Sequence, residues 1–267
     1  MSGDPLEPNW NAETVHNMKV FAYFNYMPSR DLSFTAIALF SILLIVNTAM
    51  NIRYKCYKQY IYMNALTFIG IMQITGYIFR LVTINEPTLN NFMTMQILVM
   101  LSPNVFIFVN YNVLNKVMYI INVHKKWHRI LIGSFLLYYV AVFAIQINGL
   151  VLMFSTDPND LRQGIIYLVI GTVLQILYLT LLFPAVFAVQ KSTWNNLLIF
   201  ATMYFQFACL LVRSMYKIIG LSSTKLDSIN QSEHMFYLLD AGMILLVYIS
   251  YALVPYPRYL DAMQIKF

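Results

Sequence analysis

The stretch Leu32–Met50, LSFTAIALFSILLIVNTAM, contains no charged residue over 19 consecutive positions. A helix needs about 20 mostly apolar residues to cross the hydrocarbon core of a bilayer. Six further stretches of similar length and apolarity follow along the chain: Tyr60–Val82, Asn91–Asn115, Ile130–Phe154, Gly164–Val189, Asn195–Ile219 and Glu233–Val254. Because these runs lack the ten-residue alternation of barrel strands, the sequence predicts an all-α polytopic membrane protein with seven transmembrane helices.

The composition of the whole chain agrees with a membrane protein. Of its 267 residues, 60% are hydrophobic and 10% are charged, whereas soluble domains have about 45–50% and about 25%. This excess of apolar surface excludes a disordered chain, a nucleic-acid-binding domain and almost any soluble enzyme. The net charge is +6, but the basic residues are scattered over loops and form no continuous face, so no nucleic-acid partner is expected.

The distribution of charge predicts the domains and their orientation. We expect an N-terminal tail over 1–31, a transmembrane domain over 32–254 and a C-terminal tail over 255–267. The loops at 51–59, 123–129 and 190–194 and the C-terminal tail together hold nine of the 17 Lys and Arg residues. The positive-inside rule therefore places the N-terminal tail outside and the C-terminal tail in the cytosol.

Two features on the predicted outer side follow from this orientation. The apolar patch Val20–Met27 is too short to span the membrane and is expected to lie in the interface. Asn230 begins the sequon Asn-Gln-Ser, which marks a potential glycosylation site.

The plasma membrane is the expected location, with an internal membrane as the alternative.

Ionisable residues within the spans are the most informative positions. Arg80, Arg213, Lys217 and Asp240 lie inside predicted helices, and Glu233 begins the last one. A charged residue at a helix centre costs about 2.5–3.5 kcal/mol on insertion scales, so such residues usually face the bundle interior and have a partner. At 1.5 Å per residue, Arg213 and Asp240 each lie roughly 10 Å below the outer surface. We predict an Arg213–Asp240 ion pair with Arg80 as a third member, and a Lys217 side chain that extends to the outer headgroups.

Neutral polar residues recur at helical spacing on the same helices. Gln146 lies in the fourth span and Gln175 in the fifth, while Tyr237 shares a face of the seventh with Glu233 and Asp240. These faces are expected to converge on one polar interior. Polar contacts of this kind also fasten membrane bundles that bind nothing, so a structural and a functional interpretation both stay open.

Sequence motifs for catalysis are missing. The chain has no Walker-type phosphate loop, no dinucleotide-binding glycine motif and no nucleophile elbow. His124 and His128 are four residues apart on a predicted cytosolic loop, but the other histidines lie on the opposite side, so no third metal ligand of that type is available. We therefore expect no enzymatic activity, no metal and no cofactor.

Several short motifs occur in a fixed order, one after another, in successive predicted helices. They are Gly76-Tyr-Ile-Phe-Arg80, Leu101-Ser-Pro103 followed by Tyr111, Gln146 with Gly149, Gly171 with Gln175, Arg213-Ser-Met-Tyr-Lys217, and Glu233-x3-Tyr237-x2-Asp240. As a set, from the second helix to the seventh, they resemble the fungal lipid-translocating exporter family, known through the yeast protein for aminocholesterol resistance. The polar signature of that family falls on Arg80, Gln146, Gln175, Arg213, Glu233 and Asp240.

The resemblance implies a fold and a function. The implied fold is a seven-helix membrane protein with an outside N-terminus, and the implied role is movement of, or resistance to, amphipathic molecules. In the family these include sphingoid long-chain bases, aminated sterols and, for one branch, porphyrin. Two positions depart from the family pattern, because Tyr139 and Gly220 stand where an Asp and a Glu are usual. Both departures remove acids that would balance the arginines.

Two functional hypotheses follow. The first is a translocator or exporter of amphipathic lipids such as long-chain bases and aminosterols, or a resistance factor for them. Its partners are membrane lipids or amphipathic small molecules, and its oligomeric state is left open. Asp240 and Glu233 would attract a cationic headgroup, and Arg80 and Arg213 would hold or release these acids. The full set of candidate substrate-binding residues is Asp240, Glu233, Arg213, Arg80, Gln146, Gln175 and Tyr237.

The second hypothesis is a receptor-like sensor or regulator of membrane lipid stress. Seven helices in this orientation permit it. Against it, the third span ends in Leu114-Asn-Lys-Val-Met, which differs from an acid-Arg-aromatic switch, and the seventh lacks an Asn-Pro pair.

Overall fold

The structure is a computed structural model of the whole chain. It describes residues 16–18, 20–21, 24, 26–53, 61–120, 125–155, 157–192, 197–222, 232–254, 256 and 258–260. The sequon at Asn230, His124 and the basic residues Lys55, Lys58 and Lys266 lie outside the described residues.

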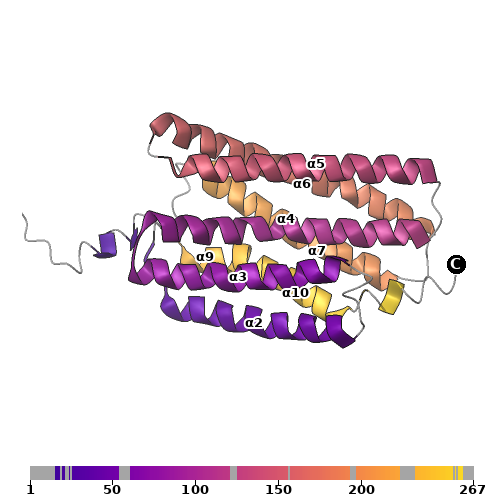
Figure 1. Cartoon of the computed structure of the whole chain (residues 1–267), viewed down its shortest axis with the longest axis horizontal. Coiled ribbons are helices and arrows are strands. Elements are labelled where there is room, and N and C mark those ends of the chain that lie inside the picture. Colours follow the sequence, from indigo (N-terminus) through magenta and orange to yellow (C-terminus); the bar gives the residue numbers. More distant parts are fainter. Residues whose placement is uncertain are drawn as a thin grey trace, which may run out of the picture.

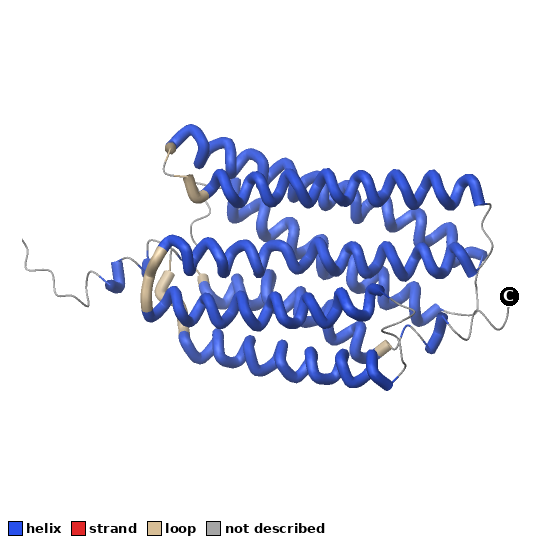
Figure 2. Tube along the Cα trace, viewed as in Figure 1, coloured by secondary structure: helices blue, strands red, loops and turns tan. Residues whose placement is uncertain are grey.

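All seven predicted spans are helical (Figure 1), and Figure 2 shows no strand in the described part of the chain. The helices are α2 (Arg30–Arg53), α3 (Ile61–Asn85), α4 (Leu89–Ile120), α5 (Lys125–Met153), α6 (Pro158–Ser192), α7 (Leu197–Ser222) and a composite last helix. That last helix consists of α9 (Glu233–Phe236), the π-helical turn η1 (Tyr237–Ala241) and α10 (Gly242–Leu253). All seven are long and apolar enough to cross a membrane.

The longest helices extend past their predicted spans. The fifth begins at Pro158, where Gly164 was expected, and the third ends at Ile120, where Asn115 was expected. Pro158 is a favourable first residue because a helix leaves its first N–H groups unpaired in any case. Apolarity alone marks the part of a helix inside hydrocarbon, so it misses turns that continue among polar headgroups.

The helices form one bundle in which α3 packs along both α2 and α4, α5 packs along α6, and α7 contacts α6 and α10 (Figure 1). Large apolar side chains cover its outside; Ile45 is 68% exposed and Leu137 is 74% exposed. Soluble monomeric proteins rarely expose an apolar surface of this extent to water, whereas membrane proteins expose such a surface to lipid. The exterior therefore fits a protein that is integral to a membrane.

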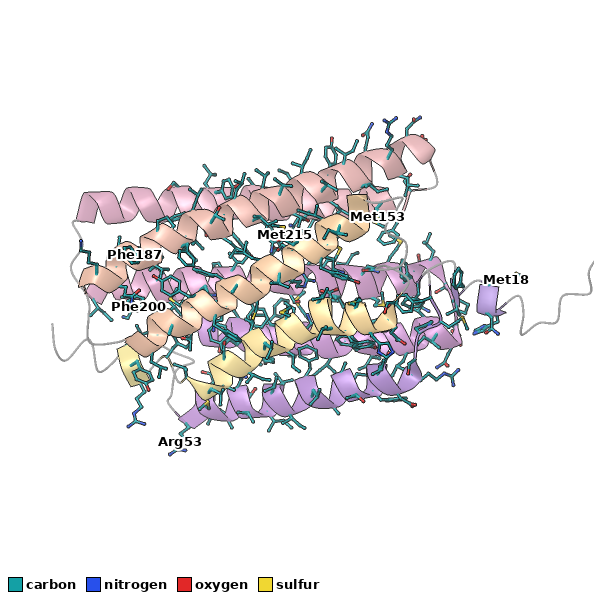
Figure 3. The ribbon with its side chains drawn as sticks, turned by 180° about the vertical axis from the view of Figure 1, so that it is seen from behind. Met18, Arg53, Met153, Phe187, Phe200 and Met215 are labelled. Atoms are coloured by element: carbon teal, nitrogen blue, oxygen red, sulfur yellow. The ribbon has the colours of Figure 1, made fainter. Side chains whose placement is uncertain are left out.

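One end of the bundle gathers the starts of α2, α4, α6 and α9 and the ends of α3, α5 and α7, and we call it the outer end, following the predicted orientation. Figure 3 shows Met18 and Met153 at this end and Arg53 at the other. Val20 and Phe24 are buried here against Ile84 and Phe92. Part of the patch expected to lie in the interface thus packs on the bundle, because α3 and α4 offer it apolar partners.

Close approach of α5 and α6 depends on glycine. A Cβ atom at Gly171 would lie 2.6 Å from Cγ of Gln146, and one at Gly149 would lie 2.8 Å from the backbone nitrogen of Leu168. Small residues allow membrane helices to approach closely, which increases dispersion contacts where no hydrophobic force acts between them. Gly171 also leaves room for the Gln146 side chain between the two helices.

We expect Gly171→Ala to destabilise the protein by about 1–3 kcal/mol, the usual cost of overpacking a closely packed site. Gln146 cannot move aside freely, since both ends of its amide are hydrogen-bonded. The matched control is Gly133→Ala on α5, where an added Cβ meets nothing within 4 Å. Thermal unfolding in detergent should show a lower midpoint for Gly171→Ala alone; equal midpoints would contradict the packing described.

Candidate functional site

The centre of the outer end is a carboxylate held by two cations. Arg213 Nε lies 2.5 Å from Asp240 Oδ1, and Lys217 Nζ lies 2.5 Å from Asp240 Oδ2. Arg213 and Lys217 are one helical turn apart on α7, so both reach the same carboxylate. Arg213 also donates to the backbone carbonyl of Val99 at 3.1 Å, which ties α4 to the cluster. The predicted Arg213–Asp240 pair is confirmed.

The prediction for Lys217 was wrong. Its side chain is only 15% exposed and turns inward to Asp240, where an extension to the outer headgroups was expected. The physical reason is that a carboxylate has two oxygens and Arg213 occupies one of them. The ammonium of Lys217, one helical turn away, can bind the second oxygen and loses little extra side-chain entropy by doing so.

Arg80 belongs to a second ion pair, which corrects its expected place beside Asp240. Its guanidinium lies 3.2 Å from Oε1 of Glu233 and also donates to the Tyr26 hydroxyl oxygen at 2.9 Å. The Glu233 oxygens accept the backbone N–H of Ser29 at 2.8 and 2.9 Å. Ser29 immediately precedes α2, so the carboxylate lies at the positive end of that helix dipole. The start of α2 thus offers Glu233 a stabilising position that the sequence did not reveal.

Aromatic rings surround the Arg80 guanidinium. Its central carbon lies 4.9, 5.7, 4.7 and 5.3 Å from the ring centroids of Phe24, Tyr26, Phe236 and Tyr237. Each such contact contributes about 0.5–2 kcal/mol, more where water is excluded. Burial raises the pKa of the Tyr26 hydroxyl above its ordinary value although Arg80 lowers it, so this phenol stays neutral and leaves the Arg80 charge in place.

Asp240 lies in the π-helical turn η1, which the sequence reasoning missed. The backbone N–H of Gly242 donates to the carbonyl of Tyr237, five residues earlier. A Cβ at Gly242 would lie 2.9 Å from that carbonyl oxygen, so glycine fits the turn. Single π turns are rare in proteins, and those that occur often lie at functional sites. Here the turn changes the angular position of Asp240 relative to Glu233, and each acid meets its own arginine.

A third cluster of polar side chains joins α4, α5 and α6. Asn104 Nδ2 donates to Gln146 Oε1 at 2.5 Å, and Gln146 Nε2 donates to Gln175 Oε1 at 2.9 Å. All three side chains are buried. We call them the amide relay. In the described part of the chain no hydrogen bond or ion pair joins it to the charged residues, so the expected single polar interior consists of separate clusters.

Tyr237 packs against α2 and α3 in this structure. Its hydroxyl lies 3.0 Å from the Ser33 hydroxyl on α2, and its ring stacks on Tyr77 with centroids 6.2 Å apart. The side chain therefore braces the last helix against α2 and α3.

A cavity of about 420 Å³ opens among the N-terminal segment, α3, α4, α5, α7 and α9. Its lining includes two cations, Arg80 and Lys217, and one amide, Gln96. Met153 also lines it, and Figure 3 shows that residue at the outer end. The aromatic side chains in its wall are Phe24, Tyr26, Phe92, Phe154, Tyr216 and Phe236.

Of the seven predicted site residues, only Arg80 lines this cavity. The described lining contains neither Asp240 nor Glu233, and the other four predicted residues also lie elsewhere. Sequence reasoning missed the aromatic wall because Phe and Tyr are common throughout the chain and carry no distinctive spacing.

Seven apolar helices that enclose buried ion pairs and a cavity at one end define a polytopic α-helical membrane protein with an internal polar site. A family model described as RTA1-like protein matches residues 66–262. The chain therefore belongs to the RTA1-like family, the family of yeast aminocholesterol-resistance and lipid-translocating proteins, as the resemblance implied. No individual curated protein and no solved structure matches the chain.

We expect Asp240→Asn to destabilise the bundle by about 3–5 kcal/mol, since removing one partner of a buried ion pair leaves the other charge uncompensated. A double-mutant cycle isolates the pair. The measurement is the unfolding free energy in detergent of Asp240→Asn, Arg213→Gln and the double variant. The double variant should lose clearly less than the sum of the two single losses. Additive losses would show that the two side chains do not interact.

Proposed function

We propose that the protein translocates amphipathic lipids between membrane leaflets, with the headgroup held in the outer-end cavity during one stage of transport. The single observation that carries this proposal is the cavity itself, in which charged side chains and an aromatic wall meet at the outer end of the bundle. Membership of a family of lipid-translocating proteins supports the same function. A resistance phenotype towards toxic amphiphiles would follow from such transport.

The cavity combines the two surfaces that an amphiphile requires. A headgroup that leaves water needs hydrogen-bonding or charged partners, because an unpaired polar group in apolar surroundings costs several kcal/mol. Arg80, Lys217 and Gln96 supply such partners. The apolar tail needs no polar partner, and aromatic and methionine side chains such as Phe92, Met100 and Met153 can contact it.

In this proposal, the route towards the other leaflet follows α4. Gln96 and Met100 line the cavity, and Asn104 follows one further turn along the same helix. Asn104 begins the amide relay, whose Gln175 amide nitrogen has no hydrogen-bond partner among the described residues. An unsatisfied buried donor costs about 1–3 kcal/mol, so its presence in a native structure calls for an explanation such as a functional role. In this proposal the relay offers polar groups to a headgroup that moves past the middle of the bundle.

The expected attraction of a cationic headgroup to Asp240 and Glu233 stays a prediction. In this conformation both carboxylates are engaged by cations of the chain. Under the proposal they act by fixing the positions of Arg80, Arg213 and Lys217. The cations in turn border the cavity or anchor α4.

The proposal is tested with the purified full-length chain in vesicles that carry a tail-labelled fluorescent lipid in one leaflet. We expect the wild-type protein to increase the rate at which leaflet asymmetry is lost. Met153→Trp should reduce this rate at least fivefold, because the larger tryptophan side chain fills part of the cavity. Leu137→Trp is the matched control: it adds the same ring on the same helix at a lipid-facing position. A panel of long-chain base, uncharged and phosphate-bearing lipids defines the substrate.

Two results would count against transport. Equal rates for wild-type vesicles and protein-free vesicles with every lipid would exclude translocation by this chain alone. Equal rates for Met153→Trp and Leu137→Trp would exclude this cavity from the route. Lipid-dependent co-purification of a signalling partner, with no translocation, would favour the receptor-like sensor.

A further inference from the structure

The buried charges at the outer end do not balance. Three cations, Arg80, Arg213 and Lys217, face two carboxylates, Glu233 and Asp240. One positive charge therefore has no counter-charge among the described residues. An excess charge in apolar surroundings is costly, and an anion that enters with it removes much of that cost.

The excess can be assigned to one of the two ion-pair groups. Arg80 and Glu233 form one pair with equal numbers of opposite charges. Asp240 meets two cations, and Arg213 alone would neutralise it. The surplus positive charge thus belongs to the Asp240 group.

The cavity exposes this surplus on one side only. Lys217 lines the cavity and is 15% exposed, whereas Asp240 is fully buried and does not line it. A molecule in the cavity consequently meets the Lys217 side chain, whereas Asp240 is not among the described lining residues. Arg80 lines the same cavity, and its buried Nε has no hydrogen-bond partner among the described residues.

We propose that this cavity selects amphiphiles with an anionic, phosphate-bearing headgroup. A phosphate offers several charged acceptor oxygens, which suit a guanidinium and an ammonium on one wall. No carboxylate lies in the described lining to attract a cationic amine. A volume of about 420 Å³ accommodates a phosphate together with the start of an acyl chain against the aromatic wall. The inference rests on the proposed function for the location of the site and adds the chemical class of its ligand.

The test measures binding to the full-length chain in an uncharged detergent. The probe is lysophosphatidic acid with a fluorescent label on its tail, followed by fluorescence anisotropy. The competitors are unlabelled lysophosphatidic acid, monoacylglycerol of equal chain length, sphingosine and inorganic phosphate. We expect lysophosphatidic acid to compete at least tenfold better than monoacylglycerol or sphingosine. Inorganic phosphate should compete weakly because it lacks a tail; competition by phosphate as strong as by the lipid would assign the same chemistry to a soluble phosphate.

Lys217→Met removes the surplus charge and leaves Asp240 paired with Arg213, so the bundle should stay folded at the temperature of the binding measurement, which thermal unfolding checks. Its affinity for lysophosphatidic acid should fall at least tenfold. The matched control is Lys191→Met, an exposed position at the end of α6 away from the cavity, which should bind like wild type. A second variant, Gln96→Glu, places a carboxylate in the cavity and should weaken binding to a similar extent. Its matched control is Gln163→Glu, which adds the same charge at an exposed position at the outer end and should bind like wild type.

Sphingosine binding as tight as lysophosphatidic acid binding would overturn the inference, as would wild-type affinity in both Lys217→Met and Gln96→Glu. These outcomes are separate from a failure of the proposed function. Selective phosphate-lipid binding without translocation would remove the transport proposal and leave this site intact. Translocation restricted to cationic lipids would keep the transport proposal and overturn the assignment of phosphate.

Discussion

The rest of the outer end depends on the burial of one carboxylate between two cations. Asp240 is removed from water and cannot persist as an ion without partners, since desolvation of a lone charge costs several kcal/mol. Arg213 and Lys217 supply those partners from α7, and Arg213 adds a bond to α4. The last helix is therefore held in rotation and depth by electrostatics, in surroundings where lipid supplies no hydrophobic force between helices. The π turn that contains Asp240 is the local adjustment that permits this contact.

The second ion pair connects this constraint to the cavity wall. Glu233 binds the start of α2, and Arg80 lies among four aromatic rings, two of them from the N-terminal segment. The same rings of Phe24 and Tyr26 form part of the cavity lining. One set of contacts thus seats the N-terminal segment, fixes the guanidinium and shapes the space beside Lys217. The arrangement explains how a polar site can persist at the end of a bundle whose exterior is apolar.

The fold and one contact could be predicted from the sequence because each follows from a strong energetic rule. Uncharged runs such as Leu32–Met50 must be helical in lipid, and buried Arg213 and Asp240 at equal depth must find each other. The depth of Arg80 in the membrane did not predict its partner, because ion pairing depends on the rotation of each helix as well as on depth. The π turn at Tyr237–Ala241, the capping of α2 by Glu233 and the inward Lys217 all depend on tertiary contacts. The aromatic wall draws on five segments of the chain, and no local pattern marks it.

The most direct test of the central claim is magic-angle-spinning NMR on the full-length protein in lipid bilayers. Lysine labelled with ¹⁵N and aspartate labelled with ¹³C would report the dipolar coupling between Nζ of Lys217 and Cγ of Asp240, assigned by its loss in Lys217→Met. The account predicts a strong coupling that shows direct contact, together with a charged ammonium and an ionised carboxylate. No coupling, with a Lys217 ammonium that exchanges freely with water, would contradict it.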